Sequence, residues 1–497
     1  MNILLDGVYG ALTALVLAGV LPLLAALYQF LIIARHGVSN NYGNVADLTP
    51  RCAIVVPAWN EGAVIGATVD RLVSLDYPDG ALRVYVVDDA STDETPDVVQ
   101  AKIAQYPGAV AHVRRDQGGQ GKAHTLNAGL ERVLADDFAQ AILIIDADVI
   151  FERDALRKMT RHLADPSVGA VTAYIKEGSE PANWMNRFIG FEYITAQAAA
   201  RRSQNLMGAM ACLAGGAQLH SRESLEAIGG RIDTTSLAED TFTTFMTQSA
   251  GRRAIFEGNA VVWAEEPADI TGLWKQRLRW ARGNVQVTKR YKSVWFRPSR
   301  DRNLGGFGFG VLWFTIFLMP VFMIAASASL VALYFADFPL SWQLFHILWI
   351  TNAIVYLLVT LFSLSIDPHT ARRSWFQAFM FPGAIALAII LFTFFPAIFT
   401  VYARDGLEAI GLPPSAVFVH ATILFVYVWL AASMLVAWLA KLIERRGWLK
   451  VLSAPMIYVC GYGPLLCAIT FAAYVLEGRN AEMRWDKTEK SGKVAIA

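Results

Sequence analysis

Long apolar runs flank one long polar segment in this chain of 497 residues. The first run, from Tyr9 to Ile33, exceeds the roughly 20 residues that a helix needs to cross a bilayer. A signal peptide would be shorter, with a basic segment before it and a small-residue cleavage site after it. We therefore predict a retained anchor. Apolar runs return beyond Phe307, at Phe309–Phe335, Phe345–Ile366, Phe376–Tyr402, Val417–Leu439 and about Pro455–Leu476.

This layout predicts four parts, and the composition agrees with them. Residues 1–36 form an N-terminal transmembrane anchor, 51–302 a cytoplasmic domain, 307–477 a transmembrane or interfacial helix bundle, and 478–497 a polar C-terminal tail. The 55% content of hydrophobic residues is more than a soluble protein of this size needs. The net charge of +1 gives no indication of a nucleic-acid partner.

Basic residues orient the chain. Arg35 and His36 follow the first run, whereas residues 1–6 contain no Lys or Arg, which places the N-terminus outside and the polar domain in the cytoplasm. If all six runs spanned, the Lys- and Arg-rich tail would lie outside, against the same rule. We therefore expect one run, such as Phe376–Tyr402 with its two internal prolines, to be broken or interfacial, and the span count stays open.

The polar domain alternates short apolar runs with helical patterns. Continuous β-branched runs separated by helices predict a parallel sheet covered on both faces, which is a nucleotide-binding α/β architecture. No G-x-G-x-x-G follows the first strand, which argues against a dinucleotide site. The expected strands are Cys52–Pro57, Arg83–Asp88 and Ala141–Asp146, and the expected helices are Ala63 to about Leu75, Thr95–Tyr106 and Ala123–Leu134.

Polar residues follow three of these strands, where ligands of parallel sheets bind. Asp146 and Asp148 could hold a divalent cation against a diphosphate, although a lone D-x-D pair is often only a solvated strand end. Asp88 and Asp89 could accept hydrogen bonds from a nucleobase or ribose. The alternative is that Asp89, Ser91 and Asp93 cap the turn and the next helix. The third group is Pro57-Ala-Trp-Asn-Glu61.

Three later segments also carry candidate chemistry. Gly118–Lys122 is a glycine-rich turn with a cation that could contact phosphate, but it is not a P-loop. Asp240, after Glu239, could be a general base, or the pair could be N-terminal helix acids that interact with the helix dipole.

Gln276-Arg-Leu-Arg-Trp280 is the last such segment. Helical spacing puts Gln276, Arg279 and Trp280 on one face, where Arg suits a diphosphate and Trp a sugar ring. An interfacial amphipathic helix is the alternative, because Trp274, Arg277 and Trp280 also suit a membrane surface.

The order of these motifs is more specific than any one of them. It resembles the processive glycosyltransferases of family 2, which include the cellulose, hyaluronan, chitin-oligosaccharide and poly-N-acetylglucosamine synthases. The resemblance covers the motifs between Arg51 and Arg302, and beyond them only the layout of the membrane bundle. Trp485–Glu489 is also similar to a terminal signature of bacterial members, where it is expected to be cytoplasmic. Ala238 departs from the pattern, since many members have Thr there.

The resemblance implies a GT-A nucleotide-sugar-binding α/β domain inserted in an α-helical transmembrane bundle, and it implies how the donor is held. Asp88 and Asp89 would hold the uridine end of a UDP-sugar. Lys122 would lie near the donor. Asp146 and Asp148 would serve the diphosphate and a Mg²⁺ or Mn²⁺ ion. The turn that would help to hold the uridine contributes Pro57, Asn60 and Glu61.

The resemblance also implies the remaining roles. Asp240 would be the catalytic base, and Gln276 and Arg279 would grip the diphosphate. Trp280 would stack under the acceptor sugar. The acceptor site would further include Gly215, Gly216 and Glu239.

These roles imply an inverting hexosyltransferase of the inner membrane with several spans. It would transfer sugar from UDP-N-acetylglucosamine or UDP-glucose to a growing β-linked polysaccharide and couple this to translocation. Expected partners are the donor, the polysaccharide, the lipid bilayer and small membrane or secretion subunits, but no nucleic acid. The alternatives are a non-processive enzyme acting on a lipid carrier, and a non-catalytic transporter or scaffold.

Overall fold

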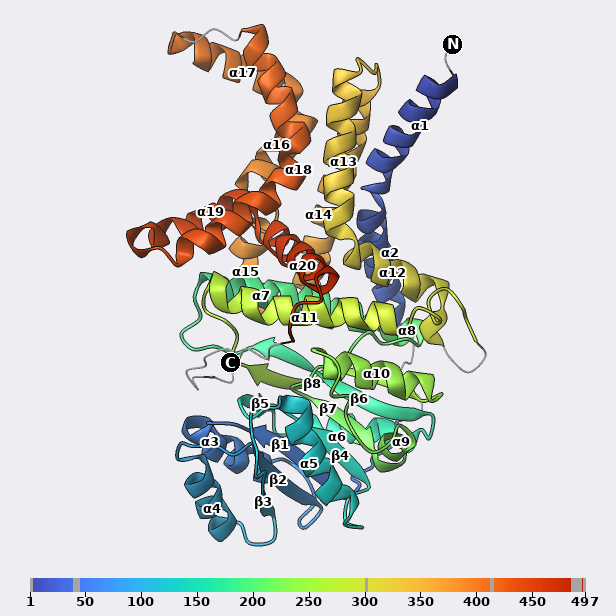
Figure 1. Ribbon diagram of the computed structural model, residues 1–497, viewed down its shortest axis with the longest axis vertical. Coiled ribbons are helices and arrows are strands. Elements are labelled where there is room, and N and C mark those ends of the chain that lie inside the picture. The colour runs from blue at the N-terminus through green and yellow to red at the C-terminus, as the bar shows by residue number, and fades with distance from the viewer. Residues whose placement is uncertain (1–2, 39–44, 300–302, 412–414, 484–493, 495–497) are drawn as a thin grey trace. The chain divides into compact units, whose positions relative to one another are not determined.

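The protein is described by a computed structural model that covers residues 3–38, 45–299, 303–411, 415–483 and 494 (Figure 1). The chain divides into two compact units. Met1–Phe30 and Val311–Arg479 form the helical unit, and Leu31–Gly310 and Asn480–Ala497 form the sheet unit. Of the predicted tail, the described residues 480–483 and 494 belong to the sheet unit.

An eight-stranded sheet forms the centre of the sheet unit, in the order β3-β2-β1-β4-β7-β6-β8-β5. Its first four strands are parallel, as predicted, and their apolar residues are buried. These strands are β1 (Cys52–Ala58), β2 (Leu82–Asp88), β3 (Val110–Arg114) and β4 (Ala141–Ile144).

The prediction of a parallel sheet is wrong for the second half, which is mixed. Strand β7 (Gln218–Ser221) runs antiparallel to β4 and to β6 (Val168–Glu177). Strand β8 (Arg253–Ala264) is parallel to β6 and antiparallel to β5 (Val149–Phe151). The turn of Asp146 and Asp148 therefore lies between parallel strand β4 and the short antiparallel strand β5.

The three expected helices of the first half are confirmed to within two residues. They are α3 (Gly62–Val73), α4 (Thr95–Gln105) and α5 (Lys122–Leu134). Helix α5 packs on the sheet through Leu126, Leu130 and Val133, which belong to one buried apolar cluster with residues of β1, β2 and β4. A side chain at Gly129 would lie 2.5 Å from Val87, so this glycine allows the close approach.

Long helices follow in the second half of the sheet unit. Helix α7 (Trp184–Tyr193) begins with a capping box in which the side chains of Asn183 and Asn186 each accept a backbone N–H. A π-helical turn, Ile194–Ala199, continues it into α8 (Ala200–Met207). The other helices are α6 (Ala155–Thr160), α9 (Arg222–Ala227), α10 (Glu239–Ser249) and α11 (Ile270–Arg290).

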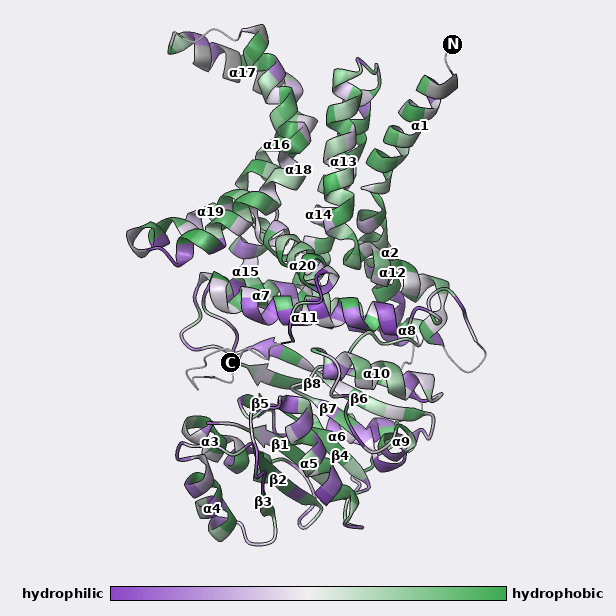
Figure 2. Cartoon of the chain, in the orientation of Figure 1, coloured by the Kyte–Doolittle hydropathy of each residue, from purple (hydrophilic) through white to green (hydrophobic). Residues whose placement is uncertain are grey.

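The helical unit is predominantly hydrophobic, whereas α11 of the sheet unit is largely hydrophilic (Figure 2). Within the described part of the chain, three helices are long and apolar enough to span a membrane, at Leu5–Val38, Ser341–Ile366 and Val417–Glu444. The chain has α1 (Ile3–Ala18), α2 (Leu21–Val38), α12 (Phe307–Phe317), α13 (Met319–Phe335), α14 (Ser341–Ile366), α15 (Pro368–Phe379), α16 (Ala384–Phe394), α17 (Pro396–Ala409), α18 (Ala416–Glu444), α19 (Ser453–Cys460) and α20 (Tyr462–Gly478).

Three further helix pairs are sharply bent: α12 with α13 by 64°, α15 with α16 by 75°, and the segment Gly447–Cys460 with α20 by 102°. The predicted run Phe376–Tyr402 is thus broken. The break between α15 and α16 contacts the break before α20, since the N–H of Tyr462 donates to the carbonyl of Phe381 at 3.0 Å. Gly383 and Gly461 both have positive φ at this meeting point, where an added Cβ would strike backbone atoms.

Candidate active site

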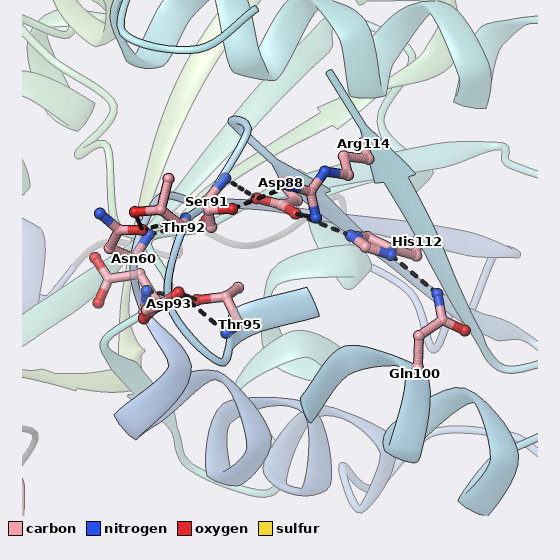
Figure 3. Close-up of polar contacts among 10 residues, drawn as sticks. Asn60, Asp88, Ser91, Thr92, Asp93, Thr95, Gln100, His112 and Arg114 are labelled. Atoms are coloured by element: carbon pink, nitrogen blue, oxygen red, sulfur yellow. Dashed lines mark hydrogen bonds and ion pairs between the residues drawn. The ribbon is translucent and has the colours of Figure 1, made fainter. Parts of the chain in front are cut away.

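Two turns at the carboxyl ends of β1 and β2 are joined by hydrogen bonds (Figure 3). The register places Ala58 opposite Asp88, so both turns begin at the same edge of the sheet. The N–H of Asn60 donates to Ser91 Oγ, and its side-chain oxygen accepts from the N–H of Thr92, both at 2.9 Å. The N–H of Glu61 donates to Thr95 Oγ1 at 2.9 Å. The predicted turn that contains Pro57, Asn60 and Glu61 is therefore rigidly attached to the Asp88 turn.

Asp88 is fully buried and holds this turn in place. Its Oδ1 accepts the N–H of Ser91 at 2.8 Å, and its Oδ2 lies 3.4 Å from both His112 and Arg114 (Figure 3). The predicted capping role of Asp93 is confirmed, since its carboxylate accepts from Gly62 and Thr95. Asp88 and Asp93 therefore shape the turn from inside.

Asp89 is held from the opposite side by the glycine-rich segment. Its Oδ2 accepts the N–H of Gly119 at 2.9 Å, and its Oδ1 forms an ion pair with Arg115. Gly118 allows this approach, because a Cβ there would lie 2.1 Å from the carbonyl oxygen of Asp89. The turn from Gly118 to Lys122 thus connects Asp89 with the start of α5.

Lys122 connects this turn with the D-x-D segment. Its ammonium lies 2.5 Å from Asp146 Oδ1 and 3.5 Å from Glu239 Oε1, and it is only 9% exposed. Burial alone would lower the pKa of Lys122, but the carboxylates of Asp146, Glu239 and Asp240 outweigh it and raise the pKa. The lysine is therefore a buried cation among carboxylates.

Gly215 and Gly216 lie at the same place. A Cβ on Gly215 would be 3.1 Å from Lys122 Nζ and 3.4 Å from Asp240 Oδ2, and one on Gly216 would be 3.8 Å from Asp146 Oδ2. The N–H of Gly215 donates to Asp240 Oδ2 at 3.2 Å. The structure thus brings together Lys122, Asp146, Gly215, Gly216, Glu239 and Asp240, as expected from the motifs.

Asp240 and Glu239 begin α10, and their environments differ. The N–H of Thr241 donates to Asp240 Oδ1 at 2.7 Å, which fixes the carboxylate from a second side. Glu239 is buried, and burial raises its pKa, while Lys122 and Arg279 oppose this rise. Arg279 of α11 therefore acts electrostatically on Glu239.

Helix α11 also supports the loop that carries this pair. Gln286 Oε1 accepts the N–H of Leu237 at 3.0 Å. At Gly283 an added Cβ would lie 2.3 Å from the Cβ of Ala238, so α11 and the loop meet through two small residues. The Glu239–Asp240 pair and the motif on α11 are thus parts of one packed arrangement.

Arg277 links Gln276 and Trp280 on α11. Gln276 Nε2 donates to Glu266 Oε2 at 3.1 Å, and Arg277 donates to Gln276 Oε1. The guanidinium of Arg277 lies 4.1 Å from the centre of the Trp280 ring. Trp274 and Arg277, which also suit a membrane surface, are both buried in the structure.

Sequence reasoning missed several of these partners. Arg277 is paired with Glu192 of α7 through two hydrogen bonds of 3.1 and 3.0 Å. Glu266 also accepts from the hydroxyl of Tyr193 at 2.5 Å. The sequence signal that could have identified Glu192 is an acidic residue inside a largely apolar stretch, Phe188–Ile194. No comparable pattern marks Arg115, the partner of Asp89.

The oxygen ligands of Asp146 and Asp148 fit a hard divalent cation. Among the described residues, no group of three or more His, Cys, Asp and Glu side chains could hold a metal ion. Two carboxylates suit Mg²⁺ or Mn²⁺ when a diphosphate and water complete the coordination. All four cysteines are free.

Comparisons with known proteins agree with this arrangement. Residues 50–283 match the family described as glycosyltransferase like family 2. The chain is 30% identical over 341 residues to the probable glycosyltransferase YdaM of Bacillus subtilis, covering 68% of this chain and 79% of that protein. It is 24% identical over 361 residues to the poly-β-1,6-N-acetyl-D-glucosamine synthase of Staphylococcus epidermidis, covering 72% and 77%.

Two further proteins are informative. The β-monoglucosyldiacylglycerol synthase of Synechocystis is 32% identical over 246 residues, which is about half of each chain. The solved structure of the mannosyltransferase PcManGT from Pyrobaculum calidifontis, in complex with GDP-Man and Mn²⁺, aligns with a TM-score of 0.55 at 24% identity, covering 73% of this chain and 99% of that one. That likeness shows the GT-A fold. The chain belongs to glycosyltransferase family 2 and is a hexosyltransferase.

Proposed function

We propose that the protein is a processive, inverting synthase that transfers sugar from a UDP-sugar to a growing β-linked polysaccharide at the membrane. The observation that carries this proposal is the packing of α11 against the Asp240 loop. It connects the acidic pair with Arg279 and, through Arg277, with the flat ring of Trp280. UDP-N-acetylglucosamine is the first donor to test, because N-acetylglucosamine polymer synthases are among the relatives.

The reaction follows from the positions of these side chains. Asp240 Oδ1 and Oδ2 are held by the N–H groups of Thr241 and Gly215, so the carboxylate is oriented to take the proton of the acceptor hydroxyl. That oxygen attacks the anomeric carbon from the face opposite UDP. Lys122 and Arg279 supply positive charge toward the leaving diphosphate. A divalent ion on Asp146 and Asp148, when bound, would neutralise further charge there.

In this proposal Asp89 meets the nucleoside, whereas Asp88 only shapes the turn. Asp88 is fully buried and already contacts Ser91, His112 and Arg114. Gln276 would reach a diphosphate only after releasing Glu266 or Arg277. We therefore propose that Arg279 is the main diphosphate contact of the motif, and that Trp280 supports the acceptor sugar.

We further propose that the C-terminus lies on the cytoplasmic side together with the catalytic domain. The guanidinium of Arg282 donates to the carbonyls of Ala481 and Glu482 at 2.7 and 3.0 Å, and Gln286 contacts Met483. A chain that leaves the sheet unit after Gly310 and returns at Asn480 crosses a membrane an even number of times. The predicted signature Trp485–Glu489 lies outside the described residues.

An even number of crossings limits how many of the bent helix pairs can span the membrane. The helices Ser341–Ile366 and Val417–Glu444 supply two crossings. Of the three bent pairs, an even number must therefore also cross, and at least one pair turns back. A count of six spans, with all five later runs crossing, does not satisfy this condition. The conflict over the tail disappears when one bent pair is re-entrant.

A transfer to a lipid is the second candidate, because a relative is 32% identical to this chain and makes a glucosyl lipid. Purified full-length protein is incubated with a panel of radiolabelled UDP-sugars and Mn²⁺, and the products are separated by size and by partition into organic solvent. We expect a ladder of water-soluble polymer from one donor. A single sugar on an extractable lipid would favour the second candidate. No UDP release with any donor would refute both.

A further inference from the structure

We propose that the ammonium of Lys122 is a built-in cation of the donor site, which a divalent metal ion must displace from Asp146 before it can bind. The inference rests on the part of the proposed function that makes Asp146 a metal ligand. It goes further because it makes metal and nucleotide bind as a coupled pair: the diphosphate accepts the ammonium that the metal releases.

The contacts of Lys122 carry this inference. The ammonium lies 2.5 Å from Asp146 Oδ1, which is the shorter of its two ion-pair distances. It also lies 3.5 Å from Glu239 Oε1 and 3.4 Å from the carbonyl oxygen of Gly215. A cation on Asp146 would therefore stand next to the ammonium, and like charges at such distances repel strongly where water is scarce.

The backbone is shaped to allow this approach. Gly119 and Gly121, with φ of +83° and +107°, turn the chain just before Lys122 begins α5. Gly215 leaves the space in which the ammonium meets the carboxylates, since its Cβ would lie 3.1 Å from Nζ. Three glycines therefore bring a single ammonium to the carboxylates of two different segments, the turn after β4 and the start of α10.

The charges explain why the ammonium is needed without ligands. Asp146, Glu239 and Asp240 approach one another, and Glu239 is buried. Buried carboxylates are costly unless a cation accompanies them. A divalent ion could replace Lys122 at Asp146, but the ammonium would then need another anion. The leaving diphosphate of the donor is an anion of that kind, so it both completes the metal coordination and receives Lys122.

The first test measures Mn²⁺ alone, by electron paramagnetic resonance on purified full-length protein in detergent. In Lys122→Met the competing charge is gone, so Mn²⁺ should bind about tenfold tighter than to wild type. Lys122→Arg keeps the charge and should stay near wild type. The matched control is Lys102→Met, which removes a comparable ion pair, 2.6 Å from Asp70, and should leave Mn²⁺ binding unchanged. Equal or weaker Mn²⁺ binding by Lys122→Met overturns the proposal.

The second test measures the UDP affinity of wild type by calorimetry, with Mn²⁺ and in EDTA. UDP should bind at least tenfold more tightly with Mn²⁺, because the metal releases the Lys122 ammonium to the diphosphate, and this gain should be smaller in Lys122→Met. Equal UDP affinity of wild type with and without Mn²⁺ overturns the proposal even if Lys122→Met does not fold. If both binding results hold and no polymer forms, the polymerase proposal fails and this one stands.

Discussion

The ion pair between Glu192 and Arg277 offers the sharpest test of how the α11 motif is positioned. Arg277 is 6% exposed, is bound by both carboxylate oxygens of Glu192, and lies against Trp280 and Gln276. Glu192→Gln keeps the size of the side chain and removes its charge. Glu192 itself lies outside the α11 motif and reaches it through the ion pair with Arg277.

The expected magnitude follows from burial. Removing one partner of a buried ion pair costs about 3–5 kcal/mol, because the other charge stays buried without compensation. For a domain of this size each kcal/mol lowers the melting temperature by about 2–4 °C, so Glu192→Gln should melt roughly 6–20 °C lower. Once Arg277 is released, Trp280 and Gln276 lose their support, and the KM for the acceptor should rise about tenfold or more.

The assay compares melting in detergent, UDP affinity, and initial rates at varied acceptor concentration. Glu226→Gln is the matched control, because Glu226 pairs with Arg222 at 2.8 Å but is 49% exposed. Exposed pairs of this kind contribute at most about 0.5 kcal/mol. Glu192→Gln should change the KM for the acceptor and leave UDP affinity nearly intact. A variant that behaves like Glu226→Gln would refute the reasoning, and so would equal losses for donor and acceptor.

Three further outcomes are expected. Asp240→Asn should lower transfer by about 10²-fold or more without changing UDP affinity, and polymer formation at normal rates would exclude it as the base. Burial raises the pKa of Glu177 to about 7, so the folded state keeps a proton that the unfolded state loses above about 4.5, and stability falls between these pH values. Glu177→Gln should remove this dependence of stability on pH. At pH 8 its free energy of unfolding, measured with urea, should exceed that of wild type by at most about 3 kcal/mol. A protease site added after Ala497 should be cut only from the cytoplasmic side, and cleavage from outside would contradict the even number of crossings.

Three strands of the first half of the sheet, β1, β2 and β4, were predictable because each is formed by a single, mostly buried apolar run. Cys52–Val56 and Ala141–Ile144 are completely buried, so their β-branched residues carry a clear signal. Strand β7 gave no such signal, since Gln218 and His220 are buried polar residues within four positions. Its antiparallel pairing depends on contacts with β4 and β6 that no local pattern reveals.

In the candidate active site, too, the local sequence predicts some features and packing decides the others. Residue types and order indicated which side chains carry chemistry, but not which of them touch. The pairing of Lys122 with Asp146 joins α5 to the end of β4, and that of Arg277 with Glu192 joins two helices 85 positions apart. Periodicity describes faces of single elements, whereas these ion pairs depend on how elements pack. Asp88 illustrates the difference, because its position at a strand end predicts a ligand contact, whereas its hydrogen bond with the N–H of Ser91 became visible only in the structure.

Packing also explains the one departure from the family pattern, at Ala238. The Cβ of Ala238 faces Gly283 so closely that any side chain at 283 would strike it at 2.3 Å. The N–H of Ala238 donates to Ser236 Oγ at 3.0 Å, and Gln286 holds the N–H of Leu237, so the loop is fixed through backbone groups. A side-chain hydroxyl at 238 is therefore not needed to orient Asp240, whose carboxylate is held by Gly215 and Thr241 instead. Helix α11 thus holds the loop of Glu239 and Asp240 through Gly283 and the side chain of Gln286. Under the proposed function, the general base and the diphosphate contact would therefore both depend on the position of this one helix.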